Sequence, residues 1–179
     1  MDTLSQYREV FTFPIEDYYK RVGFDFDKIP FSMLAHEYME DYQEKSYACD
    51  LHSDVLDVVN KAKNLGFSQT VLSASKMDYL LKQMETLHVD DLFDSIYGIN
   101  DIYAKSKVEL AHAFKQTCSL DDEIYFVGDS VHDYEVAKSI GAKCILVTTG
   151  HQNRATLESV NVPVMDSLME SLDLIYERD

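Results

Sequence analysis

Two carboxylates follow a short apolar run at the point where a helix is expected to begin. Residues 124–127 are apolar, and Gly128, Asp129 and then Asp133 come after them. The order of strand, acidic turn and helix places both carboxylates at the carboxyl end of a buried strand, where open α/β sheets bind their ligands. Carboxylate oxygens suit a hard cation such as Mg2+, which also helps to bind phosphate. The pattern therefore predicts a protein that handles phosphate.

Two other segments carry groups that could contact a phosphate. A predicted strand leads into Ser73 and Ala74, so a hydroxyl and backbone N–H groups are expected at the start of a helix. Lys107 begins another predicted helix, where its ammonium group could meet phosphate as a point charge. Lys105 is an equally close candidate for this role. These residues also have simpler interpretations, because Ser73 could cap the helix after it and Lys107 could be an exposed helix lysine.

The elements that position these groups alternate between helix and strand patterns. Helices are expected at 55–64, 77–87, 107–115 and 133–140, and strands at 69–72, 95–97, 124–127, 143–148 and 162–165. Such alternation predicts βαβ units with a parallel sheet and right-handed crossovers. Residues 1–50 are instead rich in aromatic side chains and helical in period, with one helix expected between Pro14 and Gly23 and a second at 31–47. We expect a helical cap at 1–50 and an α/β core at 51–179.

Composition and charge indicate which partners and which cellular compartment to expect. The chain has 179 residues, of which 46% are hydrophobic, and a formal net charge of -16. This charge argues against nucleic acid and against an anionic membrane surface. The three cysteines are scattered, without a C-x-x-C pair, which fits a reducing cytoplasm and no structural zinc. A cytoplasmic protein without a membrane span is expected, and its oligomeric state stays open.

The order of these motifs resembles a known group of enzymes. A strand ending in Ser73, then Lys107, then the segment from Gly128 to Gly141 resembles the second, third and fourth motifs of the haloacid dehalogenase-like (HAD) hydrolase superfamily. The stretch from Val136 to His151 is similar to the one that follows the fourth motif in phosphoglycolate-phosphatase-like members. The resemblance implies a Rossmannoid parallel sheet with a small helical cap. It also implies a Mg2+-dependent phosphatase of a small phosphate monoester, phosphoglycolate-like or a sugar phosphate.

The resemblance assigns roles to individual residues. Ser73 and Lys107 are the implied catalytic residues, and together with Ala74 they would bind the phosphoryl group. Asp129 and Asp133 would hold Mg2+ or orient Lys107, although Asp133 could be only the N-cap of its helix. In the superfamily an aspartate attacks phosphorus and forms an aspartyl-phosphate that water releases. Both His132 and His151 lack partners at metal-ligand spacing, so we interpret them as surface or rim residues.

One part of the superfamily pattern has no counterpart in this sequence. The first motif is a strand followed by Asp-x-Asp-Gly-Thr, and its first Asp is the nucleophile. The segment Asp25-Phe26-Asp27 has the spacing but follows no apolar run and continues without Gly-Thr, so a solvated cap loop is the better interpretation. We therefore expect a sheet that lacks its first, central strand and has two unpaired edges. An N-terminally truncated enzyme is the leading account, and the alternative is a pseudoenzyme, a non-catalytic phosphate-binding or interaction module.

Overall fold

Parallel strands form the centre of the molecule. The computed structural model describes residues 3–99 and 106–177. Every strand pair in it is parallel. The α/β class expected from the sequence is thus confirmed. The strands are β1 (Thr70–Lys76), β2 (Ser95–Ile99), β3 (Tyr125–Gly128), β4 (Lys143–Val147) and β5 (Val164–Met165).

Helices alternate with these strands and also precede them. Those at 55–64 and 107–115 have the expected bounds, whereas the one expected at 133–140 begins at Val131. Three helices were not predicted, at Leu4–Val10, Arg154–Glu158 and Leu168–Tyr176. Over the part of the chain that the structure describes, none of the helices has the length and apolar character of a membrane span. The helices are α1 (Leu4–Val10), α2 (Ile15–Arg21), α3 (Phe31–Ser46), α4 (Val55–Asn64), α5 (Met77–Thr86), α6 (Lys107–Lys115), α7 (Val131–Ser139), α8 (Arg154–Glu158) and α9 (Leu168–Tyr176), with a short 3-10 helix, η1 (Asp90–Leu92).

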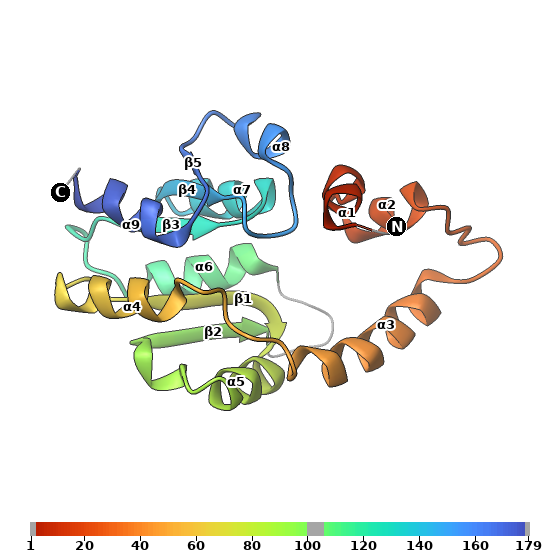
Figure 1. The fold of residues 1–179 in the computed structure, drawn as a ribbon, viewed down its shortest axis with the longest axis horizontal. Coiled ribbons are helices and arrows are strands. Elements are labelled where there is room, and N and C mark those ends of the chain that lie inside the picture. The colour runs from red at the N-terminus through yellow and green to blue at the C-terminus, as the bar shows by residue number, and fades with distance from the viewer. Residues whose placement is uncertain (1–2, 100–105, 178–179) are drawn as a thin grey trace.

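The strands fall into two separate sheets. One has the order β1-β2 and the other β3-β4-β5. Figure 1 shows β1 and β3 as the strands by which the two sheets approach each other. Among the described residues, each of these two strands pairs on one side only. This agrees with the expectation of a sheet without its central strand.

Helix α6 joins the two sheets through an apolar cluster. Ala111 of α6 is fully buried and lies in a cluster with Val136 of α7. Leu72 of β1 and Phe126 of β3 pack against the same cluster from the two sheets. The burial of this apolar surface is the main force that holds the two sheets together. The free edge of β3 is less buried, since Val127 keeps 37% of its surface exposed.

The most buried strand is β4. Its residues Cys144 to Val147 are all buried, and Leu157 of α8 and Ala137 of α7 pack around them with no exposed surface. On another face, α4 contacts α9. The Asp54 carboxylate accepts hydrogen bonds from the backbone N–H groups of Leu168 and Met169, which begin α9. The carboxyl ends of β3 and β4 are thus supported by a well-packed core.

The first three helices lie beside this core. Figure 1 shows α1 and α2 next to each other, with α3 leading back to the core. Aromatic rings join α1 to α2, and Tyr7 and Phe11 both contact the ring of Tyr18. Phe11 is 7% exposed, although few side chains in this region are buried. That residues 1–50 act as a cap stays a prediction.

Candidate functional site

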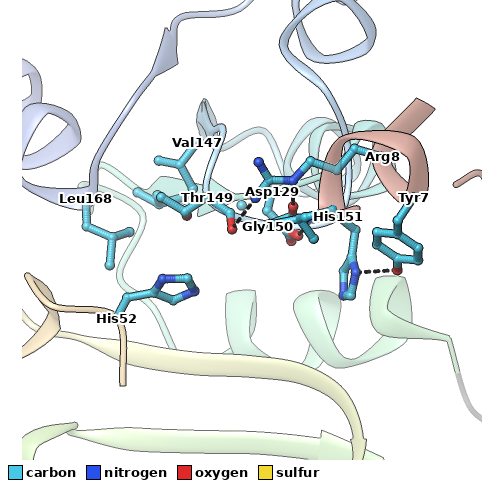
Figure 2. A pocket seen from close by; sticks show the side chains of 12 residues that line it. Tyr7, Arg8, His52, Asp129, Val147, Thr149, Gly150, His151 and Leu168 are labelled. Carbon is cyan, nitrogen blue, oxygen red and sulfur yellow. Dashed lines mark hydrogen bonds between the residues drawn. The ribbon is translucent and has the colours of Figure 1, made fainter. Parts of the chain in front are cut away.

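A cavity opens where β3 and β4 end. Its volume is about 560 Å3, and it brings together the start of the chain, the residue after β3 and the loop after β4 (Figure 2). This is the edge at which a parallel sheet is expected to bind a ligand. The lining residues are Leu4, Tyr7, Arg8, His52, Val127, Gly128, Asp129, Val147, Thr149, Gly150, His151 and Leu168.

Asp129 follows β3 directly and points into this cavity. Its Oδ2 atom accepts a hydrogen bond of 2.7 Å from the backbone N–H of His151. The backbone of Gly150 is also close, since a Cβ atom there would lie 1.7 Å from Oδ2. The other oxygen, Oδ1, has no hydrogen-bond partner among the described residues. Asp129 is therefore held by one oxygen, and the other is available to a ligand.

Asp133 is bound from two sides. Its Oδ2 atom accepts hydrogen bonds from the N–H groups of Asp129 and Ser130 at 3.0 and 3.1 Å, and from the Ser130 hydroxyl at 2.7 Å. Its Oδ1 atom accepts a hydrogen bond of 2.5 Å from Lys107 Nζ. Ser130, and not Asp133, is the N-cap of α7, and the two form a capping box. Asp133 therefore fixes the turn and orients Lys107 at once.

The electrostatics of this pair follow from its burial. Asp133 is 2% exposed. Burial alone would raise the pKa of its carboxyl group, but the charge and hydrogen bond of Lys107 and the donors from Ser130 and Asp129 outweigh it, so the pKa is lowered. Gly128 makes room for this arrangement, because a Cβ atom there would lie 2.3 Å from Asp133 Cβ. The carboxylate is thus charged at neutral pH and pairs with a charged lysine.

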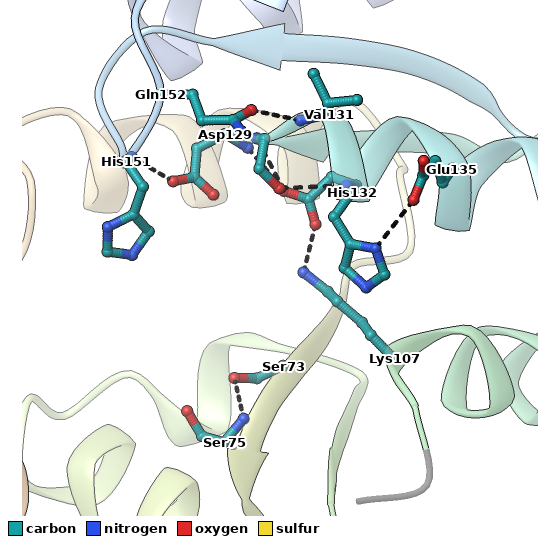
Figure 3. Close-up of polar contacts among 11 residues, drawn as sticks. Ser73, Ser75, Lys107, Asp129, Val131, His132, Glu135, His151 and Gln152 are labelled. Atoms are coloured by element: carbon teal, nitrogen blue, oxygen red, sulfur yellow. Dashed lines mark hydrogen bonds and ion pairs between the residues drawn. The ribbon is translucent and has the colours of Figure 1, made fainter. Parts of the chain in front are cut away.

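Lys107 is the first residue of α6 and extends toward α7. Its side chain is 18% exposed, and its ammonium group also lies 5.7 Å from the centre of the Phe126 ring. Figure 3 shows Lys107 facing the turn that carries Asp129, and hydrogen bonds link the two through Asp133. The rival candidate, Lys105, lies outside the described residues. Lys107 is not an exposed helix lysine, and its partner holds it at the edge of the site.

Ser73 lies on β1, across the site from Asp129 (Figure 3). Its Oγ atom accepts a hydrogen bond of 3.1 Å from the Ser75 N–H, so that donor is already used within the strand. The strand continues to Lys76, which is the N-cap of α5. The interpretation of Ser73 as the cap of this helix is therefore wrong. Neither Ser73, the exposed Ala74 nor Lys107 lines the cavity itself.

The donor set bears on a metal ion in two ways. Within residues 3–99 and 106–177 there is no group of three or more His, Cys, Asp or Glu side chains that could hold one. Mg2+ often needs only one or two carboxylates, and takes water and substrate phosphate as its other ligands. The free oxygen of Asp129 fits this chemistry. Both oxygens of Asp133 are engaged by protein donors, so this residue fits the orientation of Lys107 and not metal ligation.

Asp25 lies away from these groups. It is in the loop between α2 and α3, where its carboxylate accepts a hydrogen bond from the Asp27 N–H and pairs with Lys28. It does not line the cavity. The interpretation of this segment as a solvated loop fits these contacts better than a role as nucleophile.

Several residues at the site were missed by the sequence analysis. Tyr7 and Arg8 of α1 reach the cavity, and both contact residues 149–151, which follow β4. The position of that loop after a strand was a usable signal, because the ends of parallel strands share one edge of the sheet. His151 is exposed at the rim, yet its backbone holds Asp129. His132 lies near Glu135 and Phe13 and does not line the cavity.

Comparison with known families agrees with this geometry. The family model of the haloacid dehalogenase-like hydrolases matches residues 3–147. The chain belongs to this family of hydrolases, as the order of its motifs indicated. A comparison with curated proteins gave no match.

Solved structures share the fold at low sequence identity. A haloacid dehalogenase-like hydrolase from Streptococcus pneumoniae has a TM-score of 0.81 and 20% identity, over 98% of this chain and 82% of that one. A candidate phosphatase from Clostridium acetobutylicum has a TM-score of 0.79 and 19% identity, over 99% and 83%. A candidate phosphoglycolate phosphatase from Lactobacillus delbrueckii subsp. bulgaricus has a TM-score of 0.68 and 16% identity, over 97% and 83%. These similarities establish the fold.

Proposed function

We propose that the protein is a Mg2+-dependent phosphatase of a small phosphate monoester, phosphoglycolate-like or a sugar phosphate. The observation that carries this proposal is the linked arrangement of Lys107, Asp133 and Asp129 at the carboxyl end of β3. It combines a fixed cation with a carboxylate that keeps one oxygen free. The family assignment and the names of the structural relatives support the same chemistry.

Each residue has a distinct role in this proposal. Asp129 would hold Mg2+ through its free oxygen, and the ion would supply positive charge to the phosphoryl oxygens. Lys107 would offset the charge that spreads over those oxygens during transfer, and it needs no reorganisation because Asp133 already orients it. Ser73, on β1, would donate a hydrogen bond from its hydroxyl group to a phosphoryl oxygen. The aspartyl-phosphate route of the superfamily would in addition need an aspartate that attacks phosphorus and releases the alcohol, and none of the residues given roles here supplies that nucleophile.

A second function is favoured by a specific observation. Among the described residues, Asp129 is the only carboxylate that lines the cavity. A phosphatase that forms an aspartyl-phosphate would need a second carboxylate in this cavity, to attack phosphorus. The alternative is therefore a module that binds phosphate through Lys107, Ser73 and a metal at Asp129 without turning it over.

One experiment separates the two functions. The purified chain is tested for hydrolysis of an aryl phosphate and for binding of inorganic phosphate, with and without Mg2+. Asp129→Asn is the site variant, and Asp90→Asn, in the exposed η1, is the control. Mg2+-dependent turnover that is lost only in Asp129→Asn supports the phosphatase. Phosphate binding without turnover supports the module, and neither activity from a folded chain contradicts both.

A further inference from the structure

Residues 149–151, called here the 149–151 segment, lie between the Asp129 carboxylate and helix α1. On one side, the His151 N–H donates to Asp129 Oδ2 at 2.7 Å. The Gly150 backbone lies against the same oxygen, with no room for a Cβ atom. The position of this segment therefore decides which way the Asp129 carboxylate faces.

Helix α1 holds the segment from the other side. Arg8 donates from Nε to the Gly150 carbonyl at 2.7 Å and from Nη2 to the Thr149 carbonyl at 2.9 Å. Tyr7 and His151 share a hydrogen bond of 2.7 Å between the phenol oxygen and Nδ1. These contacts join residues more than 140 positions apart in the chain, so they fix the segment to α1 and not merely to its own neighbours.

Aromatic packing and one further hydrogen bond complete the contact. The Phe11 ring stacks on the His151 ring, with centroids 4.8 Å apart and planes 21° from parallel. Asn153, the N-cap of α8, donates from its side chain to the Arg8 carbonyl at 3.3 Å. Phe11 is buried, whereas the other side chains of this contact are part-buried or exposed.

We propose that Arg8 and Tyr7 are positioning residues that set the Asp129 carboxylate through the 149–151 segment. This rests on the proposed role of Asp129 as a metal ligand. Helix α1, at the start of the chain, thereby controls the metal site at the end of β3. A displacement of α1 withdraws the His151 N–H from Asp129 and loosens the site. The region proposed to act as a cap is thus mechanically linked to metal binding.

The charge of Arg8 gives the proposal a sharp test. Arg8 lines the same cavity as Asp129. If it acted only as a nearby positive charge, its removal would strengthen the binding of a cation at Asp129. If it positions the segment, its removal weakens that binding. Arg8→Lys separates the effects further, because lysine keeps the charge but cannot donate to two carbonyls through a rigid fork.

The experiment compares the wild type with Arg8→Lys, Arg8→Ala and Tyr7→Phe. Glu9→Ala is the matched control, because Glu9 is an exposed residue of the same helix. Amide hydrogen exchange of the 149–151 segment is measured on the metal-free protein, and Mn2+ affinity by electron paramagnetic resonance. We expect faster exchange in both Arg8 variants and a loss of about tenfold in Mn2+ affinity, as when a group that orients a metal ligand is removed. Tyr7→Phe should shift both readouts less, and Glu9→Ala neither.

Two results would overturn the proposal. The first is an Arg8→Lys variant with wild-type exchange in the 149–151 segment, and the second is tighter Mn2+ binding by Arg8→Ala. If Arg8→Ala does not fold, Arg8→Lys and Tyr7→Phe decide the question. If the wild type binds no Mn2+, the proposed metal role of Asp129 fails, while the exchange data still show whether α1 holds the segment.

Discussion

The backbone of Gly150 lies against the carboxylate of Asp129, so that a Cβ atom on Gly150 would lie 1.7 Å from Oδ2. We expect Gly150→Ala to displace either the loop or the carboxylate. The His151 N–H would then no longer meet Asp129, and Mn2+ affinity would fall by about tenfold. Equilibrium titration with Mn2+ measures this.

Gly141→Ala is the control for this change. Gly141 has a φ of +70°, and its Cβ position meets no atom within 4 Å. Alanine there is strained, so it should lower the melting temperature and leave Mn2+ affinity unchanged. Gly150 is not among the residues with positive φ. Alanine there should therefore lower Mn2+ affinity and leave the melting temperature unchanged. Equal loss of affinity in both variants would mean that stability, and not contact with Asp129, governs the affinity for Mn2+.

The buried pair of Lys107 and Asp133 predicts an acid-sensitive fold. The pKa of Asp133 is lowered in the folded state, so its stabilisation is present above the ordinary aspartate value, about 4, and is lost as pH falls through the lowered value. Asp133→Asn should reduce the free energy of unfolding at pH 7 by about 3 kcal/mol, because it leaves Lys107 without its charged partner. It should also flatten the fall in stability below about pH 4.

Urea unfolding at several pH values tests this, with Asp173→Asn as the control. Asp173 pairs with Lys61 in a more exposed setting, with 53% of its side chain accessible. Its loss should cost less than about 1 kcal/mol. A similar loss in the free energy of unfolding for both variants would show that the pair of Lys107 and Asp133 stabilises the fold no more than an exposed pair does.

The elements with clear periodicity and end signals could be predicted from the sequence. Both α4 and α6 have the expected bounds, and the strand before Asp129 was found from its apolar run and acidic turn. Helix α9 carried a usable signal that was missed. Ser167 and Glu170 have capping-box spacing, and the Ser167 hydroxyl accepts from the Glu170 N–H. Helix α1 has no buried residue, and beyond its Thr3 N-cap it is held by contacts with a distant loop. No local pattern could reveal those.

The position of Asp129 at the end of β3 could be predicted because it follows an apolar strand directly, whereas its role at the site stays a prediction. Asp129, Asp133 and Lys107 do meet, but the sequence could not divide the roles of the two carboxylates. That division depends on which oxygens the Ser130 turn and Lys107 occupy, and this is a matter of side-chain geometry. Arg8 was missed because it is 141 positions from Thr149, whose carbonyl it contacts.

The three cysteines should differ widely in reactivity. Burial is the main reason that the pKa of Cys144 rises to about 12, with the charge of Asp133 a smaller contribution. Cys49 is exposed and Cys118 is intermediate. The thiolate is the reactive form, so in the native protein a disulfide reagent at pH 8 should modify Cys49 first and leave Cys144 intact until unfolding. Mass spectrometry of the labelled peptides measures the order. Early labelling of Cys144 would mean that β4 opens in the native state.

The open edges of β1 and β3 bear on how copies of the chain behave toward one another in solution. Along these edges, within the described residues, backbone groups have no strand partner, and such edges can recruit another strand. A net charge of -16 keeps copies apart when little salt is present. Repulsion of this kind reaches about 30 Å at 0.01 M ionic strength but only about 3 Å at 1 M. Self-association should therefore increase with salt, and sedimentation velocity across that range would reveal it. An unchanged profile would mean that the edges do not recruit strands, whereas a salt-dependent one would make ionic strength the practical control over colloidal stability.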